Sequence, residues 1–331
     1  MDLITEIRDV IIRKGISILD PWIGSEETKK EILAVLLAGR SLILEGPPGV
    51  GKTLLAKSVA RSLPDILAND CSFNCDPSSS LCPQCQTGKR QLITINGENR
   101  FMRIQGSPEL TAEDLVGDID PVLAMRYGAF DSRAFSPGKI VKANRKILFL
   151  DEINRLSEKI QNTLLQVLQE RELTIGNYDI NFSIDTILIS TMNSNDIAGI
   201  ENLSEALKDR LERVLIPYPS ESEELSILDT YGKKIIVVPQ EIKEKIVQIC
   251  QNTRKDKELE FPASPRSAIA VYELSQSFAR LRNDKEVNIE DLSAAIRLAF
   301  MGRLSPDLEG SFFNKTEEYI KSLIDMFKSN G

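Results

Sequence analysis

The chain has 331 residues, a length that corresponds to about two domains of ordinary size and excludes a small disulfide-stapled peptide. Its composition, 42% hydrophobic and 27% charged, excludes a largely disordered protein. The 41 Lys and Arg residues against 49 Asp and Glu give a net charge of −8, so no overall positive field draws the chain to nucleic acid, which is not an expected partner.

The first forty residues predict two helices. Apolar residues at helical spacing indicate a helix over residues 1–20, and Ser25 is suited to cap a second helix. Asp2 and Glu6 stand where a secretory signal carries basic residues. The longest apolar run, Ile32–Ala38, is much shorter than the roughly 18 residues of a membrane span. We therefore expect a cytoplasmic protein without a membrane helix.

A short apolar run then leads through a glycine-rich loop into a helix. Ser41–Leu44 is too short for a helix and suits a buried parallel strand, and helical periodicity resumes from Thr53 to Leu63. Four further strands are predicted, with enough chain between them for helical crossovers: Phe101–Gln105, Lys146–Leu150, Thr186–Thr191 and Arg213–Ile216. This alternation predicts an α/β domain with a mostly parallel sheet.

A β-hairpin is predicted within this domain, over about residues 172–184. Polar and apolar residues alternate there on both sides of Gly176-Asn177, a dipeptide suited to a tight turn. We expect the hairpin to protrude from the domain.

The chain after residue 219 predicts helices alone. Helix-start signals recur in it, at Ser220, at Ser264 and at Asn288. We therefore divide the chain into an α/β domain over residues 1–219 and a smaller all-α domain that occupies the remainder, residues 220–331.

Two features of the second domain receive structural interpretations. Cys250 stands on a predicted helix face, where it is expected to be a small core residue. The charged run at residues 254–258 is interpreted as a solvated loop.

Residues 46–53 carry the most specific motif in the chain. They match the phosphate-binding pattern G-x-x-x-x-G-K-[ST] in full and stand between a predicted strand and a predicted helix. The glycines let backbone N–H groups face the phosphates, Lys52 is expected to reach the β- and γ-phosphates, and the Thr53 hydroxyl to ligate Mg²⁺. The alternative is a glycine-rich turn that binds nothing. The residues assigned to the nucleotide are Gly46, Pro47, Pro48, Gly49, Val50, Gly51, Lys52, Thr53 and Leu54.

Two adjacent carboxylates, Asp151 and Glu152, follow one of the predicted strands. Ligands bind beyond the carboxyl ends of parallel strands, and burial of the apolar strand does not explain acids there. Histidine is absent from the chain, so proton transfer falls to carboxylates, lysine or water. Asp151 is expected to hold Mg²⁺ through water, and Glu152 to polarise the water that attacks the γ-phosphate. The alternative is a solvated acid pair at a strand end.

The residues around these acids resemble one family. The segments that carry the resemblance are Asp151-Glu152-Ile153-Asn154-Arg155, Gln161, Leu164-Leu165, Gln169-Glu170-Arg171 and Thr174-Ile175-Gly176. They closely resemble the MoxR family of AAA+ ATPases, which is related to the magnesium-chelatase I subunits. The resemblance runs in order over about residues 15–305. It implies an AAA+ P-loop NTPase core followed by a helical lid, and hydrolysis of ATP with Mg²⁺.

The resemblance also assigns further site residues. Ile23-Gly24 matches the segment that packs on adenine, and Asn193 matches sensor 1, which orients the attacking water. Arg210 matches the arginine finger that reaches a neighbouring subunit's ATP, and Arg266 matches sensor 2. Taken singly, such arginines are more often solvated or salt-bridged. A finger that acts on a neighbour implies a homo-oligomer, and the resemblance indicates a hexameric ring.

The same resemblance implies a chaperone-like, ATP-driven remodeller. The hairpin at 172–184 corresponds to the pre-sensor-1 insertion of this branch, and residues 116–144 resemble its helix-2 insertion. Partners in this family often carry a von Willebrand factor A domain. Three alternatives stay open: the motor subunit of a metal chelatase, a DNA-translocating AAA+ protein and a nucleotide-dependent scaffold. The Asn154-Arg155 and Gln161 pattern favours MoxR over the chelatase subunits.

Four cysteines lie in an insert at about residues 65–90 that the family pattern does not require. Cys71, Cys75, Cys82 and Cys85 form C-x₃-C-x₆-C-x₂-C in a segment predicted as loop. Four thiolates around Zn²⁺ would cross-link a segment too polar to form its own core. Such a zinc is structural, because four protein ligands leave no open position for water. Two disulfides or an iron–sulfur cluster are the alternatives, although a reducing cytosol disfavours disulfides.

Overall fold

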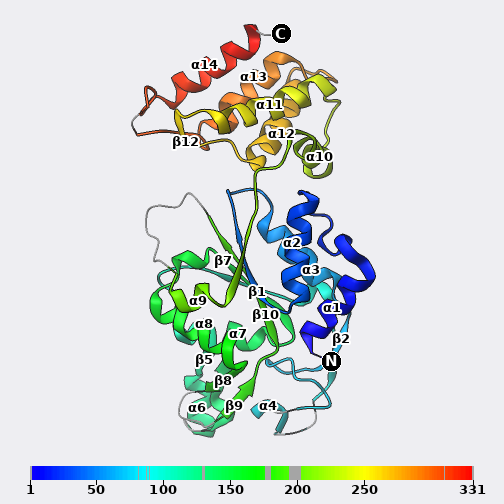
Figure 1. The fold of residues 1–331 in the computed structure, drawn as a ribbon, viewed down its shortest axis with the longest axis vertical. Coiled ribbons are helices and arrows are strands. Elements are labelled where there is room, and N and C mark those ends of the chain that lie inside the picture. The colour runs from blue at the N-terminus through cyan, green and yellow to red at the C-terminus, as the bar shows by residue number, and fades with distance from the viewer. Residues whose placement is uncertain are drawn as a thin grey trace. The chain divides into compact units, whose positions relative to one another are not determined.

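The computed structural model describes residues 2–80, 82–86, 88, 90–128, 131–175, 180–193, 203–308 and 310–329. The chain forms two compact units (Figure 1). The first consists of Met1–Gly46 and Gly51–Ile216, and the second of Pro47–Val50 and Pro217–Gly331.

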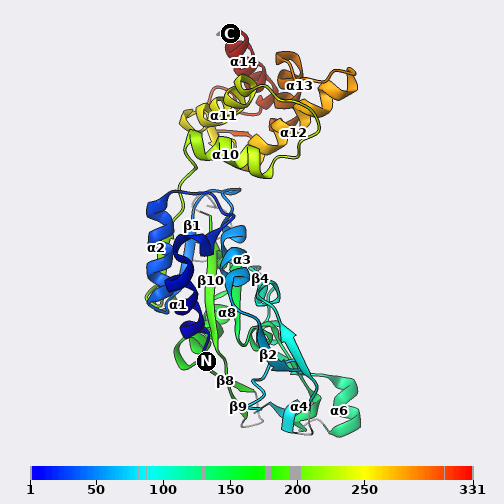
Figure 2. The same cartoon turned by 90° about the vertical axis from the view of Figure 1, so that its right-hand side faces the viewer.

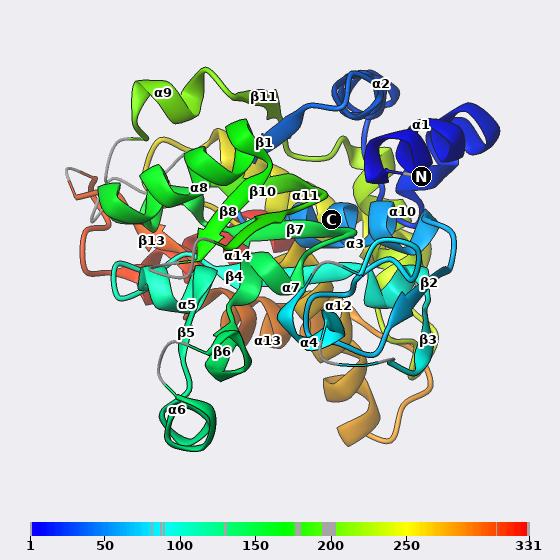
Figure 3. The same ribbon diagram turned by 90° about the horizontal axis from the view of Figure 1, so that it is seen from below.

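A five-stranded sheet forms the centre of the first unit. Its strands are β1 (Ser41–Glu45), β4 (Phe101–Gln105), β7 (Lys146–Asp151), β10 (Thr186–Met192) and β11 (Leu211–Leu215). Their order is β11-β1-β10-β7-β4 (Figure 3), and every neighbouring pair is parallel. All five predicted strands are therefore present, and the expected α/β class with a mostly parallel sheet is confirmed.

The strand register brings several sequence-distant segments to one edge of this sheet. Glu45 at the end of β1 pairs with Met192 of β10, and Gln105 at the end of β4 pairs with Asp151 of β7. Because the strands are parallel, the segments that follow them leave at the same edge. The glycine-rich loop, the acid pair and Asn193 all follow these strand ends.

Helices flank the sheet. Their bounds in the first unit are α1 (Leu3–Lys14), η1 (Gly15–Leu19), α2 (Glu26–Leu37), α3 (Lys52–Ser62), η2 (Gly97–Asn99), α5 (Ala112–Val116), α7 (Lys139–Lys142), η4 (Ile153–Arg155), α8 (Glu158–Glu170) and α9 (Glu205–Lys208). Figures 1 and 3 show α2 and α3 on one side of the sheet and α8 and α9 on the other. The helix predicted over residues 1–20 is divided between α1 and a 3₁₀ turn, and Ser25 caps α2 as predicted, accepting from the Thr28 N–H.

Three insertions precede three adjacent strands of the sheet. They contain the antiparallel pairs β2 (Ile66–Asn69) with β3 (Leu92–Ile95), β5 (Gly117–Ile119) with β6 (Phe135–Pro137), and β8 (Glu172–Ile175) with β9 (Ile180–Ser183), and the helices α4 (Pro83–Gln86), α6 (Pro121–Tyr127) and η3 (Ser132–Ala134). They lead into β4, β7 and β10 respectively, which are neighbours in the sheet. Figures 1 and 2 show α4, α6, β8 and β9 gathered at one end of the unit.

Two predictions about these insertions have different outcomes. The hairpin at 172–184 is confirmed in its strands β8 and β9, while its predicted turn at Gly176-Asn177 lies outside the described residues. The cysteine insert is not all loop as expected, because β2 pairs with β3 and closes its base. Ile66, Ala68 and Ile95 form a small apolar cluster on this pair.

The second unit is built from helices and one short strand pair. Its elements are α10 (Glu221–Tyr231), α11 (Gln240–Lys255), β12 (Leu259–Phe261), α12 (Pro265–Leu281), α13 (Ile289–Phe300), β13 (Ser305–Pro306) and α14 (Thr316–Ser329). The predicted starts are confirmed, since Ser220, Ser264 and Asn288 each form a capping box. The antiparallel β12–β13 pair was not predicted, because strands this short give no alternation signal. Cys250 is fully buried in the core, as predicted.

The charged run at residues 254–258 is only in part the predicted solvated loop. Residues 256–258 follow α11 and both lysines of the run are exposed, but Arg254 and Asp256 have specific partners. Arg254 belongs to α11, and its guanidinium donates to both carboxylate oxygens of Glu224, at 2.8 and 2.7 Å. The Arg254 and Glu224 side chains are 8% and 0% exposed. Asp256 accepts a hydrogen bond from the Tyr319 hydroxyl at 2.7 Å. The partners of Arg254 and Asp256 are distant in sequence, so local composition could not reveal them.

Candidate functional site

The glycine-rich loop joins β1 to α3, and its geometry requires glycine at two points. A Cβ atom at Gly46 would lie 2.2 Å from the Ile216 carbonyl oxygen. Gly51 has φ 89°, a left-handed conformation that glycine adopts readily. Gly51 also precedes α3 without a side-chain cap. Such a helix start suits an anionic group.

Lys52 begins α3 and is buried, with 8% of its surface exposed. Its Nζ donates to the Gly46 carbonyl oxygen at 2.5 Å and to Asn193 Oδ1 at 3.0 Å. Burial lowers the pKa of Lys52 from 10.5 to about 8, and the opposing effect of Asp151 and then Glu152 is smaller. An anion bound at Nζ would offset this desolvation and raise the pKa again.

Glu152 follows the end of β7 and is held by several side chains. It accepts hydrogen bonds from Arg155 Nη1 at 2.9 Å and Gln105 Nε2 at 3.2 Å. Asn193 Nδ2 lies 3.5 Å from its other carboxylate oxygen. Its backbone N–H donates to Thr191 Oγ1 at 2.9 Å. These contacts fix the carboxylate at the sheet edge where the glycine-rich loop begins.

Asp151 has two partners of its own. It accepts from Thr191 Oγ1 at 2.6 Å and from Arg103 Nη2 at 2.6 Å. The Arg103 side chain is 50% exposed, whereas that of Asp151 is 18% exposed. The carboxylate therefore stays close to the surface, where a hydrated cation could replace the arginine.

The structure brings together four predicted residues, namely Lys52, Asp151, Glu152 and Asn193. Asn193 is the link, since its amide contacts the Lys52 ammonium on one side and lies near the Glu152 carboxylate on the other. The arrangement supplies a cation for a phosphate, carboxylate oxygens for a metal ion and a carboxylate that can accept a proton.

Four residues of this network were missed by sequence reasoning. Arg103 and Gln105 lie two residues apart near the end of β4, the strand that pairs with β7. Polar residues at the end of a predicted strand were the signal that could have identified them as site residues. Thr191 lies in β10 and Arg155 in η4, where only the fold reveals their partners.

Trp22 is a further missed residue. It is 3% exposed, and a Cβ atom at Gly51 would lie 2.9 Å from its Cδ1 atom. The predicted adenine-contacting residues Ile23 and Gly24 follow it and are half-buried. Trp22 is the only tryptophan of the chain, and its position beside the assigned Ile23-Gly24 segment was the available signal.

The remaining loop residues occupy two places. Thr53 and Leu54 are half-buried in the first turn of α3. Pro47, Pro48, Gly49 and Val50 belong to the second unit, in which a Cβ atom at Gly49 would lie 3.3 Å from the Cβ of Arg266. Arg266 itself lies in the first turn of α12.

Arg210 lies apart from these residues. It precedes β11, whose first residue, Leu211, pairs with Ser41 at the start of β1. Gly46 follows the other end of β1, so the two are separated by about 16 Å of strand. Arg210 is exposed, and its Nη1 donates to Asp209 at 2.6 Å. The structure therefore does not place Arg210 with the phosphate-binding loop of its own chain.

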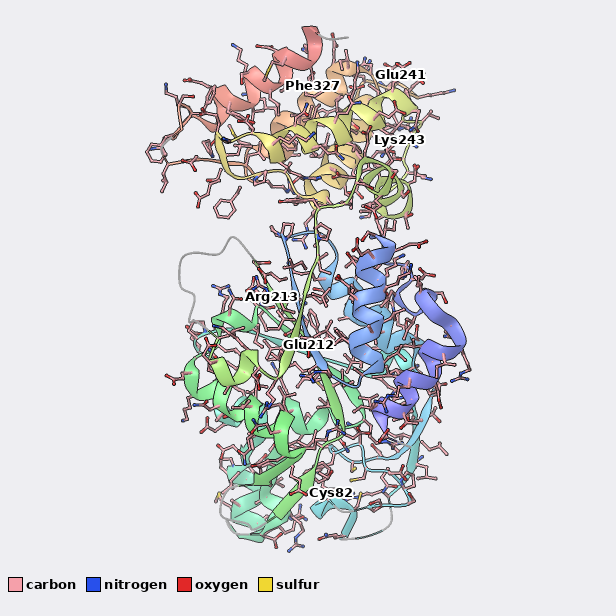
Figure 4. All side chains as sticks on the ribbon, in the orientation of Figure 1. Cys82, Glu212, Arg213, Glu241, Lys243 and Phe327 are labelled. Atoms are coloured by element: carbon pink, nitrogen blue, oxygen red, sulfur yellow. The ribbon has the colours of Figure 1, made fainter. Side chains whose placement is uncertain are left out.

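The four insert cysteines come together in one cluster, and Figure 4 shows one of them, Cys82, at the end of the first unit where α4 lies. Their Sγ atoms all lie within 4.8 Å of one another, and all four are free thiols. Thiolates arranged tetrahedrally at about 2.3 Å from a zinc ion stand about 3.8 Å apart, so the cluster fits such an ion. N–H groups of Cys75, Cys85 and Asn69 point to sulfurs at 3.3–3.4 Å, as donors to metal-bound thiolates do.

The charge of the cluster also fits a cation. Hydrogen bonds from Cys75 and Cys82 lower the pKa of Cys71 to about 2. The hydrogen bond to Cys71 raises the pKa of Cys75 to about 12, and hydrogen bonds to Cys71 and Cys75 raise the pKa of Cys82. One thiolate thus suppresses the ionisation of its neighbours. A bound cation would allow all four to ionise.

Comparisons with known proteins agree with this architecture. The family described as "ATPase family associated with various cellular activities (AAA)" matches residues 83–213, and "AAA lid domain" matches residues 251–321. "Magnesium chelatase, subunit ChlI" matches residues 20–95. The chain belongs to the AAA+ ATPases. The core and lid matches of this AAA+ protein fall in its first and second units respectively.

Relatives of this AAA+ protein include a chaperone and a magnesium-chelatase homolog. "Chaperone MoxR1" of Mycobacterium tuberculosis is 27% identical, over 83% of this chain and 70% of the relative. "Magnesium-chelatase subunit ChlI homolog" of Methanocaldococcus jannaschii is 26% identical, over 92% and 90%. The solved RuvB Holliday junction branch migration motor of Thermotoga maritima is similar in fold, with TM-score 0.52 and 17% identity, over 94% of this chain and 79% of that one.

Within the described ranges, no helix of this AAA+ protein is both long and apolar enough to cross a bilayer.

Proposed function

We propose that this AAA+ protein hydrolyses ATP, with Mg²⁺, at the sheet edge formed by the glycine-rich loop, the acid pair and Asn193. The observation that carries the proposal is the contact chain from Lys52 through Asn193 to Glu152, at 3.0 and 3.5 Å. In this arrangement a phosphate held at Lys52 lies within reach of a carboxylate. The buried ammonium gains a charged partner when that phosphate binds, which favours a triphosphate over a neutral ligand.

The residues of the chain divide the work of hydrolysis. Lys52 and the N–H groups at the start of α3 bind the phosphates, and Thr53 and Asp151 offer oxygens to Mg²⁺. Mg²⁺, when bound, neutralises charge on the phosphate oxygens. Glu152 orients the attacking water and accepts its proton. Asn193, which contacts Lys52 and lies near Glu152, positions the two side chains relative to each other. Arg155 and Gln105 fix the Glu152 carboxylate.

The active unit in this proposal is a ring, which we infer to be a hexamer. Arg210 is exposed and stands at the sheet edge opposite the phosphate-binding loop. It serves as an arginine finger toward the ATP of a neighbouring protomer, and Arg266 at the start of α12 serves as sensor 2. Both roles place an arginine where negative charge develops in the transition state.

The energy of hydrolysis is used to remodel a protein partner, one that carries a von Willebrand factor A domain. A relative of the chain is named a chaperone, which supports this use. The motor of a metal chelatase is the second candidate, because residues 20–95 match the magnesium-chelatase family and a chelatase homolog aligns over 92% of the chain.

A capture experiment separates these two candidates. Glu152→Gln protein should retain ATP and hold its partner, and Lys52→Ala protein is the matched control that should not. A partner with a von Willebrand factor A domain and no chelatase subunit supports remodelling, and recovery of chelatase subunits supports the second candidate. Stimulation of turnover by DNA, with a steep dependence on salt, would contradict both.

We further propose that the cysteine cluster holds a structural Zn²⁺. Metal analysis of protein purified without chelator, with its thiols reduced, should give about one zinc per chain. Cys82→Ser should lose this zinc, whereas Cys250→Ser should keep it, because Cys250 lies in the core of the second unit. Less than about half an equivalent of zinc in the unaltered protein would reject the assignment.

A further inference from the structure

The cysteine insert contributes one residue, Phe73, to a place where all three insertions meet. Phe73 lies in the short segment between Cys71 and Cys75 and is 1% exposed. Its ring centroid is 5.0 Å from that of Phe182 in β9 and 6.3 Å from that of Phe135 in β6. One side chain of the insert therefore contacts an aromatic ring from each of the other two insertions.

Hydrogen bonds hold the backbone around Phe73 in the same way. Asn144, which follows the second insertion, donates from Nδ2 to the Phe73 carbonyl oxygen at 2.9 Å. Its Oδ1 accepts from the N–H of Asp185, which follows the third insertion, at 3.0 Å. Asn74 donates to the Lys142 carbonyl oxygen at 2.9 Å. Asn144 is 6% exposed, so these bonds form within the core.

The segment that carries Phe73 has little regular structure to fix it. It lies between β2 and α4, and Asn74 adopts a positive φ of 49°. Cys75 and Cys82 belong to the same apolar cluster as Phe73, Phe135 and Phe182. A cross-link among the four sulfurs would therefore fix the position of the ring at the centre of this cluster.

We propose that the metal bound by Cys71, Cys75, Cys82 and Cys85 is a brace that couples the cysteine insert to the β5–β6 and β8–β9 insertions through Phe73. The proposal rests on the proposed metal site but not on ATP hydrolysis. Phe73 and Asn144 are positioning residues in it. The brace lies at the edge where the strands begin, and the predicted nucleotide site lies where they end, so loss of the metal loosens the insertions and leaves nucleotide binding intact.

The test follows amide hydrogen exchange in full-length protein, with zinc content and nucleotide-dependent Trp22 fluorescence measured on the same samples. Removal of zinc should speed exchange in β5–β6 and β8–β9 about tenfold or more. Phe73→Leu should retain zinc and speed exchange in the same strands about fivefold or more with the metal bound. Phe101→Leu is the matched control, because it removes a ring stacked on Phe149 at 5.3 Å elsewhere in the unit. That control should leave exchange in the two insertions unchanged.

The outcomes are distinguishable. If Phe73→Leu protein binds one equivalent of zinc and its hydrogen exchange is unchanged, the brace is contradicted and the metal site is still supported. Absence of zinc from the unaltered protein overturns the metal site and the brace together, whatever the ATPase activity. If zinc removal unfolds the first unit, Trp22 no longer responds to nucleotide, and the zinc-loaded Phe73→Leu protein then decides the question.

Discussion

The amide oxygen of Asn193 accepts a hydrogen bond from the buried ammonium of Lys52, at 3.0 Å. The two residues are 141 positions apart in sequence and come together because β1 and β10 are adjacent parallel strands. The contact places an amide between the phosphate-binding cation and the Glu152 carboxylate, which is the arrangement that the proposed hydrolysis uses.

Asn193→Ala removes that link. We expect kcat for ATP to fall about 100-fold, because the water-orienting carboxylate loses a neighbour and Lys52 loses an acceptor. Nucleotide affinity, measured by Trp22 fluorescence, should change less than about threefold. Ser190→Ala, in β10 three residues before Asn193, is the control and should leave turnover near that of the unaltered protein. A kcat within a factor of two of normal in Asn193→Ala would contradict the assigned role.

Nucleotide affinity should depend on pH through Lys52. Its pKa in the free protein is lowered to about 8 by burial, and a bound triphosphate raises it. Affinity is therefore constant below pH 8 and falls as the pH rises above it, by up to about tenfold per unit, because the free protein must then take up a proton to bind. Titrations of Trp22 fluorescence from pH 6.5 to 9.5 test this. Affinity that stays flat up to pH 9.5 would show that Lys52 is not the phosphate-binding cation.

Lys52→Ala and Arg210→Ala should complement each other in mixed rings. Each variant alone is expected to hydrolyse ATP at least about 100-fold more slowly than the unaltered protein. Mixing them creates interfaces in which an intact loop faces an intact Arg210, so part of the activity returns. Native mass spectrometry verifies that mixed rings form. Mixed rings without any recovered turnover would exclude a finger that acts between protomers.

The buried pair of Glu224 and Arg254 predicts a stability effect in the second unit. Glu224→Gln leaves a guanidinium that is 8% exposed without its charged partner, and should lower the free energy of unfolding by about 3 kcal/mol. Glu317→Gln is the control, because its pair with Arg297 is 59% and 67% exposed and should contribute less than about 1 kcal/mol. Denaturant unfolding measures both. Equal effects of the two substitutions would contradict the importance of burial here.

The parts of the fold that depend on short local sequence patterns could be predicted from the sequence. Short apolar runs identified all five core strands, and cap residues such as Ser220 and Asn288 identified helix starts. The β2–β3 pair was missed, because Leu67 and Leu92 are exposed and the strands lack a clear alternation.

The site was predictable where a residue follows a strand or belongs to a compact motif. Lys52, Asp151, Glu152 and Asn193 were placed correctly at one edge, since parallel strands deliver their ends together. The residues that hydrogen-bond these site residues could not be predicted. Arg103 reaches Asp151 across 48 residues of sequence, and only the β4–β7 register shows that they meet.

The most direct test of the central claim is the rate of ATP hydrolysis by assembled protein with Mg²⁺, compared with that of Glu152→Gln. We expect the unaltered protein to turn over ATP, and the variant to bind ATP within about threefold of normal while hydrolysing it at least about 100-fold more slowly. Turnover that is unaffected by Glu152→Gln, or an assembled protein that neither binds nor hydrolyses ATP in the presence of its partner, would contradict the account.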